Sequence, residues 1–227
     1  MSAKYTYLFL MLGTIVGPVL LSFDKRVSFY KKWKFLPIPL FITLLYFVIW
    51  DSYFTKIGIW NFNDNYIIGK KMVALPIEEW LFFIFVPFAC IFIYECTNFY
   101  IKKDILQNYA YKINGIILLI ISVVAILNFH KTYTAFNFIS AAILMAYIQF
   151  ILKPTWLGRF YIGYFISLIP FFLVNGILTY LPVVTYNNAE NLAIRIFTIP
   201  IEDTIYCLLL LLMNVTMYEW LKQRKNI

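Results

Sequence analysis

Four acidic side chains stand in two short motifs that repeat along the chain. Leu75–Trp80 reads LPIEEW, and 124 positions later Ile199–Thr204 reads IPIEDT. Each motif opens a long apolar stretch, where charged groups are costly and usually functional. Carboxyl groups that an apolar environment holds in different protonation states act as general acid and general base. The four candidates for this chemistry are Glu78, Glu79, Glu202 and Asp203.

Each motif contains a proline that marks the start of a helix, Pro76 in the first and Pro200 in the second. Proline is favoured in the first helical turn, so the acids lie in that turn. The helix dipole stabilises negative charge there by about 0.3–1 kcal/mol, so ordinary interfacial acids are the alternative interpretation. Two acids in both copies, followed at once by apolar and aromatic residues, favour a site.

Other side chains near the motifs are candidates for substrate contact or support. Residues four apart share a helix face, which places aromatic rings beside the acids. Such rings stabilise carbocations. Asp51 and Asn175, which match at the same offset of 124, could hydrogen-bond the acids or end their helices. The candidate contacts are Trp80, Phe82, Phe83, Tyr206, Asp51 and Asn175, and the candidate supporting charges are Lys71 and Arg195.

The composition is that of a membrane protein. The 227 residues are 63% hydrophobic and 13% charged, whereas a soluble domain is about half apolar and about a quarter charged. Seven apolar stretches approach the length of about 20 residues that a spanning helix needs. We expect spans at Tyr5–Phe23, Phe35–Trp50, Pro76–Cys96, Ile113–Phe129, Phe136–Leu152, Phe160–Leu181 and Pro200–Leu221.

The repeat extends over the whole region around the motifs. At the same offset Phe62 matches Tyr186 and Asn63 matches Asn187, without a gap. The predicted fold is therefore all-α and polytopic, with two parallel three-helix repeats joined by one connecting helix. Their predicted bounds are 1–100, 101–131 and 132–227. Sites in such proteins form between the halves, which would bring the two acid pairs face to face.

Lysine and arginine predict the orientation. The loops on one side carry thirteen of them and those on the other side six. The positive-inside rule then places the C-terminus in the cytoplasm and the N-terminus outside, in the cell (inner) membrane. The net charge of +8 does not indicate nucleic acid, because the basic residues lie between apolar segments.

The sequence lacks the motifs of several other kinds of binding site and active site. There is no nucleotide-binding glycine motif and no HExxH, and the one histidine, His130, cannot form a histidine metal cluster. We therefore expect neither a metal nor a cofactor. Cys90 and Cys207 lie inside apolar runs, where packing is the ordinary role.

The motifs PIEEW at Pro76–Trp80 and PIEDTIY at Pro200–Tyr206 resemble those of the small integral-membrane carotenoid cyclases. The chain is similar to the fused single-chain form of the two-subunit bacterial lycopene cyclases and to the cyclase half of the fungal bifunctional enzyme. The resemblance implies a redox-neutral isomerase, or intramolecular lyase, that closes the linear ends of lycopene into β-ionone rings. It implies no flavin.

The resemblance also implies the surroundings of the reaction. The substrate would be lycopene or a related linear carotenoid in the lipid membrane, reached through a lateral opening, with contacts to other enzymes of carotenoid biosynthesis. It leaves open the order of acid and base, the number of ends cyclised, and a β, ε or γ ring. The strongest alternative is a small proton-coupled transporter with parallel three-helix repeats.

Overall fold

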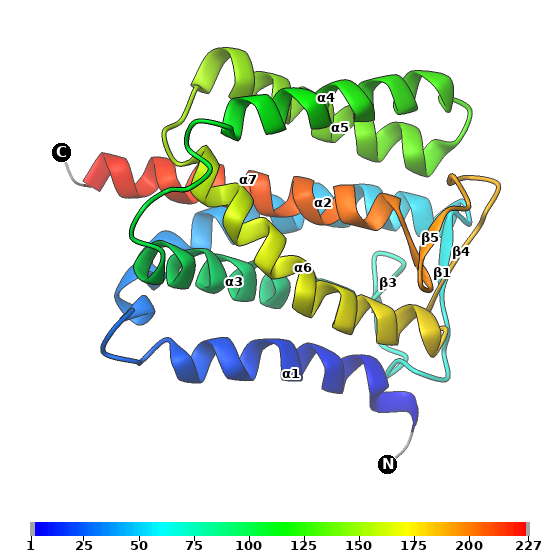
Figure 1. Cartoon of the computed structure of the whole chain (residues 1–227). Helices are drawn as coiled ribbons and strands as arrows, with labels where there is room; N and C mark the ends of the chain where they lie inside the picture. The colour runs from blue at the N-terminus through cyan, green and yellow to red at the C-terminus, as the bar shows by residue number, and fades with distance from the viewer. Residues whose placement is uncertain (1–2, 226–227) are drawn as a thin grey trace.

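The computed structural model describes residues 3–225 and has seven long helices (Figure 1). Each is long and apolar enough to cross a membrane, which confirms the predicted all-α membrane fold. The helices are α1 (Thr6–Leu21), α2 (Pro37–Lys56), α3 (Ile77–Tyr100), α4 (Ala110–Leu127), α5 (Thr132–Tyr147), α6 (Leu157–Tyr180) and α7 (Glu202–Lys225). Short 3₁₀ segments span Ala3–Tyr5 and Phe29–Phe35, and a π-helical turn spans Ile148–Leu152.

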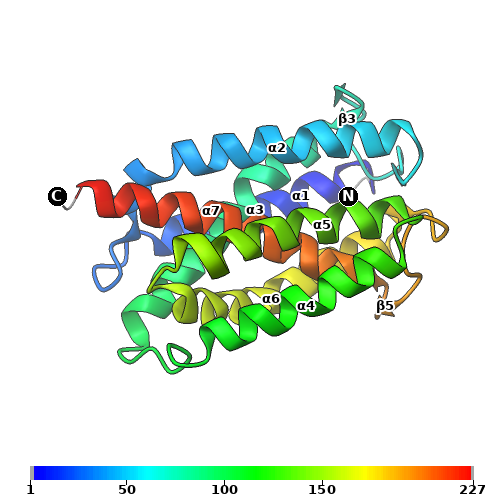
Figure 2. The same cartoon turned by 90° about the horizontal axis from the view of Figure 1, so that it is seen from above.

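Helices α3 and α7, which carry the acidic motifs, lie inside the bundle. Helix α1 packs on α3, and α5 packs on α7. Helices α2 and α6 each contact both α3 and α7, while the connecting helix α4 covers α5 and α6. Figures 1 and 2 show most of the long helices running along one common direction, and α6 crosses them obliquely in Figure 1. The arrangement buries the two motif helices most deeply, so their acids are shielded from lipid and water.

Short strands cover the end of the bundle at which α3 and α7 begin. Strand β1 (Trp60–Phe62) pairs antiparallel with β4 (Val184–Tyr186) and so joins the two repeats. Strands β2 (Lys71–Met72) and β3 (Leu75–Pro76) form one hairpin, and β5 (Arg195–Ile196) and β6 (Ile199–Pro200) form the other. The sequence analysis did not predict these strands, because two- and three-residue segments carry no periodicity to detect.

The backbone around β1 and β4 shows how the repeats are related. The Asn63 N–H donates to the Val183 carbonyl at 2.9 Å, and the Asn187 N–H donates to the Ile59 carbonyl at 2.8 Å. At the offset of 124, Asn63 corresponds to Asn187 and Ile59 corresponds to Val183. Exchanging the two repeats therefore turns each of these bonds into the other. Such reciprocal bonds are the signature of a pseudo-two-fold axis between the repeats. The bounds 1–100, 101–131 and 132–227 stay a prediction.

Asp51 and Asn175 do not end their helices. Helix α2 continues past Asp51 to Lys56, and α6 continues past Asn175 to Tyr180. The reason is that the turn after Asp51 is packed, since Phe54 is buried with its ring 5.3 Å from that of Trp60. The helix-ending interpretation was therefore wrong, and both polar side chains lie within spans.

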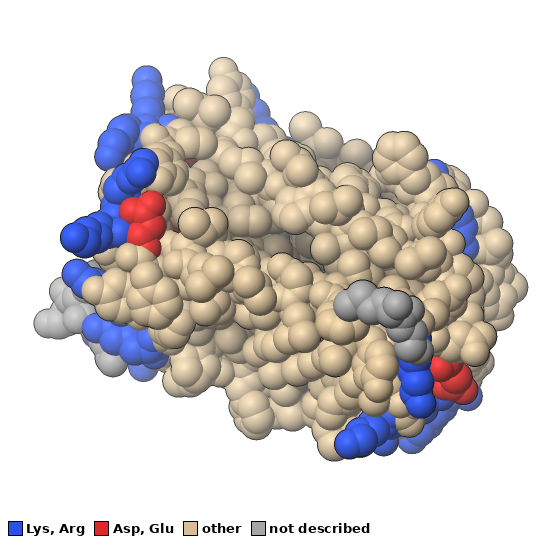
Figure 3. All heavy atoms as spheres, turned by 90° about the horizontal axis from the view of Figure 1, so that it is seen from below, with Lys and Arg blue, Asp and Glu red and all other residues tan. Residues whose placement is uncertain are grey.

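Charged side chains gather at the two ends of the molecule and leave an apolar belt between them (Figure 3). At the end away from the motifs, the buried Glu95 carboxylate pairs with Lys32 and with Lys222, the latter at 2.8 Å. It also accepts a hydrogen bond from the buried Tyr218 hydroxyl at 2.8 Å. Glu95 therefore ties the 3₁₀ segment Phe29–Phe35 to both α3 and α7.

We expect Glu95→Leu to lower the free energy of unfolding by about 1–3 kcal/mol, because it leaves buried donors without an acceptor. Thermal melting in detergent measures the loss. Asp24→Asn is the control, since Asp24 pairs with Arg26 at 3.7 Å on the surface and such pairs contribute about 0–1 kcal/mol. Equal melting of the two variants would contradict a stabilising role for Glu95.

Candidate active site

A polar pocket lies between the two repeats, beneath strands β1 and β4. It encloses about 50 Å³, which is room for one or two waters at about 30 Å³ each. Every repeat contributes helices and a strand to its wall. The lining residues are Tyr7, Asp51, Trp60, Phe62, Glu79, Phe82, Tyr133, Phe171, Asn175, Leu178, Val184, Tyr186, Asp203 and Tyr206.

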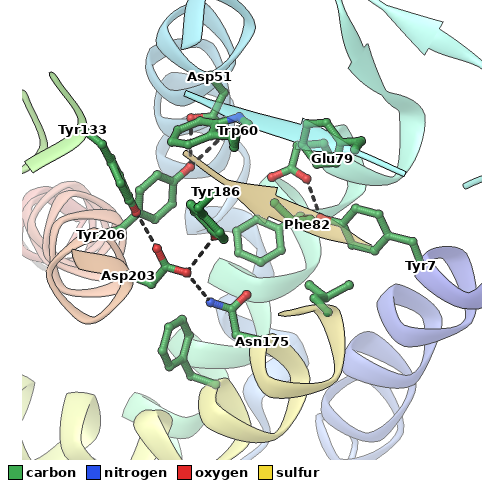
Figure 4. Close-up of a pocket in the computed structure, with 14 residues that line it drawn as sticks. Tyr7, Asp51, Trp60, Glu79, Phe82, Tyr133, Asn175, Tyr186, Asp203 and Tyr206 are labelled. Carbon is green, nitrogen blue, oxygen red and sulfur yellow. Dashed lines mark hydrogen bonds between the residues drawn. The ribbon is translucent and has the colours of Figure 1, made fainter. Parts of the chain in front are cut away.

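Asp203 lies on one side of this pocket, surrounded by hydrogen-bond donors (Figure 4). The Tyr133 hydroxyl donates to its Oδ1 at 2.6 Å, and the Tyr186 hydroxyl donates to its Oδ2 at 2.8 Å. The Asn175 amide donates to Oδ2 at 2.9 Å. Hydrogen bonds of this kind favour the ionised form of a carboxyl group. The three donors therefore fix the orientation of the Asp203 carboxyl group.

Tyr186 is a dependable donor because its phenol does not ionise near neutral pH. Burial, followed by the negative charge of Asp203, raises the pKa of Tyr186 well above the ordinary value of 10.0. The hydroxyl therefore keeps its proton and directs it toward Asp203. Strand β4 fixes this side chain above the pocket, where Phe62 of β1 occupies the equivalent position in the other repeat.

Glu79 and Asp51 lie on other sides of the pocket and have fewer donors. The Tyr7 hydroxyl donates to Glu79 Oε2 at 2.5 Å. The Tyr206 hydroxyl lies 3.2 Å and 3.1 Å from the two oxygens of Asp51. Three carboxyl groups in one water-poor pocket repel one another if all are ionised. Glu79 and Asp51, with one tyrosine donor each, are better suited to hold a proton than Asp203 with its three donors.

Glu78 and Glu202 do not line this pocket, although both are fully buried. The Ile68 N–H donates to Glu78 Oε1 at 2.7 Å, and the Leu192 N–H donates to Glu202 Oε1 at 2.6 Å. Glu202 also accepts from the Thr134 hydroxyl at 2.7 Å. These two acids therefore bind the loops that precede β2 and β5. Only the other member of each motif pair, Glu79 or Asp203, lines the pocket between the repeats.

The predicted substrate contacts also divide into residues that line the pocket and residues that lie outside it. Phe82 and Tyr206 line the pocket, as do Asp51 and Asn175. Trp80 instead donates from its indole N–H to the Met72 carbonyl at 3.2 Å, outside the pocket. Phe83 is buried outside the pocket, and its ring stacks on that of Phe47 with 5.6 Å between the ring centres. Trp80 and Phe83 therefore support the motif helix and do not face the acids.

The predicted supporting charges make no direct contact with the motif acids, although the Arg195 guanidinium lies 5.9 Å from the centre of the Tyr186 ring. Lys71 pairs with Asp64 at 2.8 Å. Arg195 donates to the Thr198 carbonyl at 2.7 Å and to the Asn188 side chain at 2.8 Å. Both stabilise the hairpin loops in which they stand. No described contact links either of them to a motif acid.

The sequence analysis missed the tyrosines that orient the acids. Tyr7 of α1 and Tyr133 of α5 make matching bonds to Glu79 and Asp203. The two tyrosines are 126 positions apart, whereas the motifs are 124 apart. Comparison at one fixed offset therefore could not pair them. Allowing a two-residue shift in the first helix of each repeat would have found the match.

The fold and this pocket define a class of protein, a multi-pass membrane protein with opposed carboxyl groups in a buried aromatic pocket. Within residues 3–225, no group of three His, Cys, Asp or Glu side chains has the arrangement of a metal site. Carboxyl groups in such a pocket can release and accept protons.

The chain belongs to the lycopene cyclase family. The family model named Lycopene cyclase matches residues 4–97 and 130–221, which are the two repeats without the connecting helix. A curated relative, the bifunctional lycopene cyclase/phytoene synthase of Pyrenophora tritici-repentis, is 49% identical over 35 residues. This match covers 15% of the chain and 6% of that relative. No solved structure matches.

Proposed function

We propose that this protein cyclises the linear ends of lycopene, or of a related carotenoid, by acid–base catalysis inside the bilayer. The observation that carries the proposal is the pocket in which Glu79, Asp51 and Asp203 meet among aromatic rings. Membership of the lycopene cyclase family supports the substrate class. The reaction needs no oxidant, because the product is an isomer of the substrate.

In the proposed mechanism Glu79 is the acid. Its carboxyl proton adds to the terminal double bond of the substrate and leaves a tertiary cation. The electron pair of a neighbouring double bond then forms the ring carbon–carbon bond, which moves the positive charge into the ring. Glu79 suits this step because Tyr7 alone holds its carboxyl group in the pocket. General acid catalysis of this kind contributes about 100- to 10,000-fold.

Asp203 is the proposed base. It removes a proton from the carbon beside the cation, and the electrons of that C–H bond form the ring double bond. Before this step its negative charge stabilises the cation, together with the rings of Phe82 and Tyr206. Asp51, held by Tyr206, lies where it could pass a proton between the two catalytic carboxyl groups. A β ring follows when the proton comes from the ring carbon on the polyene side.

The direct test is expression in a bacterial host that accumulates lycopene, followed by chromatography of the pigments. We expect lycopene to be replaced by cyclised carotenes when the wild-type protein is present in the membrane. Unchanged lycopene beside correctly inserted protein would refute the function. A proton-coupled transporter would give that result, and no contact in the described residues favours it.

The source of the proton gives a second expected result. Membranes incubated with lycopene in D₂O should place one deuterium in each ring that closes, because a carboxyl proton exchanges with water before it is delivered. Mass spectrometry of the carotenes measures this incorporation. Unlabelled rings formed in D₂O would exclude delivery of a proton from water and leave a proton that passes from one substrate to the next, either directly or through the carboxyl groups.

The orientation is also part of the proposal. The charge asymmetry of the loops supports an orientation with the acid pocket near the outer face and the end containing Glu95 in the cytoplasm, and we propose the cell (inner) membrane as its location. Cysteine substitutions in the β2–β3 hairpin and at the C-terminal end of α7, labelled with an impermeant maleimide in intact cells, test this orientation.

A further inference from the structure

An apolar groove runs along the lipid-facing side of α3, between α1 and α6. It encloses about 380 Å³, within the range of about 300–1,000 Å³ that small-molecule sites occupy. Its walls are almost free of polar atoms. The lining residues are Phe9, Leu10, Gly13, Thr14, Pro18, Phe82, Val86, Ala89, Cys90, Ile93, Ser167, Pro170, Phe171, Leu173, Val174, Asn175 and Ile177. The view of the molecule from the α1 side shows a hollow in the apolar belt (Figure 3).

The groove adjoins the acid pocket. Phe82, Phe171 and Asn175 line both spaces, so the two are separated only by side chains. In Figure 4, Phe82 lies in the middle of the group formed by the acids and tyrosines. The acid pocket alone is too small for a cyclising end group, whereas the groove offers an apolar volume that ends at the acids. A long hydrocarbon fits this combination, with its end at Phe82 and its chain in the groove.

The equivalent space in the other repeat is filled by larger side chains. Pseudo-symmetry would place a second groove between α5 and α2, over α7. There Gly13 is replaced by Ile139, and Val174 is replaced by Trp50. The Trp50 ring lies 4.7 Å from that of Phe136 and 5.3 Å from that of Tyr206.

A polar contact closes the deeper part of that space. Cys90 and Ser167 line the groove, and their counterparts in the other repeat are Asn214 and Thr43. The Asn214 amide donates to the Thr43 hydroxyl at 3.1 Å across the helices α7 and α2. The duplication has therefore produced one open path to the acids and one blocked path.

We infer that the groove between α1 and α6 is the single path by which the polyene chain reaches the acids, with Gly13 as its specificity-determining opening. This inference rests on the proposed function. The occupant is a linear apolar chain, because the wall carries no charge and leads to a site for hydrocarbon chemistry. Gly13 determines access because a Cβ at this position would meet nothing within 4 Å, so its missing side chain leaves the groove open.

The test is Gly13→Phe. Long side chains on a helix point toward its N-terminus, so the ring would lie in the groove on the side of the acids. Two controls separate blockage from misfolding. Gly13→Ala removes the glycine without filling the groove, and Leu12→Phe adds a ring at the same depth on a side chain that is 39% exposed and does not line the groove.

We expect Gly13→Phe to lower the rate of cyclisation at least tenfold, while Leu12→Phe stays within about twofold of wild type, Gly13→Ala loses less than Gly13→Phe, and all three variants melt like wild type. Lycopene retained by purified protein in nanodiscs gives a readout separate from activity. Measured in the inactive Glu79→Gln background, retention should fall when Gly13→Phe is added. If wild type cyclises lycopene and Gly13→Phe retains and cyclises it equally, the groove inference is overturned. If wild type forms no ring, the proposed function fails instead.

Discussion

Glu79→Gln should abolish ring formation while leaving the protein folded. The amide cannot deliver a proton, so we expect the rate of cyclisation to fall by about 100- to 10,000-fold, the contribution usual for a general acid. The substitution keeps the size of the side chain and keeps an acceptor for the Tyr7 hydroxyl. Pigment chromatography in lycopene-accumulating cells measures the loss, and immunodetection in membranes confirms that the protein is present.

The neighbouring acid is the matched control. In Glu78→Gln the side-chain carbonyl can still accept the hydrogen bond that the Ile68 N–H donates. We therefore expect Glu78→Gln to keep a rate within about tenfold of wild type, since it changes a loop contact and not a reacting group. Loss of activity in Glu78→Gln with retention in Glu79→Gln would reverse the roles assigned to the two residues.

The difference between the two acids of each motif follows from helix geometry. With 3.6 residues per turn, adjacent side chains point about 100° apart. Glu78 and Glu79 therefore point in different directions, as do Glu202 and Asp203, and only Glu79 and Asp203 line the pocket. The motif predicted the right helices and the right depth. Which member faces the partner repeat depends on how α3 and α7 are rotated, and packing with α1, α2, α5 and α6 determines that rotation.

Other parts of the site were predictable to different degrees. The apolar stretches predicted the seven spans, and the ungapped repeat predicted a site between the halves, including Asp51 and Asn175. The tyrosines of α1 and α5 were not predicted, because their contacts join residues about 70 positions apart. The hairpin roles of Lys71 and Arg195 depend on short strands that leave no pattern in the sequence.

The asymmetry of the repeats explains how a duplicated fold obtains two different carboxyl groups. Asp203 is one methylene shorter than Glu79 and has three donors in place of one. Asn175 supplies one of them, whereas its counterpart Asp51 is an acid that cannot donate when ionised. The same divergence filled one groove with Trp50 and left the other open at Gly13. In the proposed mechanism this divergence makes the acid, the base and the substrate path distinct while the backbone keeps its two-fold relation.

Asp203→Asn should remove the base and the charge that stabilises the cation. We expect a loss of about 100- to 1,000-fold, the effect of removing an oriented electrostatic partner of a transition state. The fold should persist, because an amide still accepts from Tyr133, the Tyr186 hydroxyl can accept from it, and the Asn175 amide can turn its oxygen toward it. The rate of carotene formation in isolated membranes, with melting in detergent as the folding control, measures the effect.

Asp203→Glu distinguishes charge from position. It restores a carboxylate and makes the second motif match the first, but it moves the charge outward by one methylene from donors placed at 2.6 Å, 2.8 Å and 2.9 Å. We expect its rate to lie between those of wild type and Asp203→Asn, because the charge is kept and its three hydrogen bonds are strained. If Asp203→Asn keeps full activity and Asp51→Asn loses it, the base is Asp51. The donors around Asp203 would then have a structural role, holding β4 and α5 against α7.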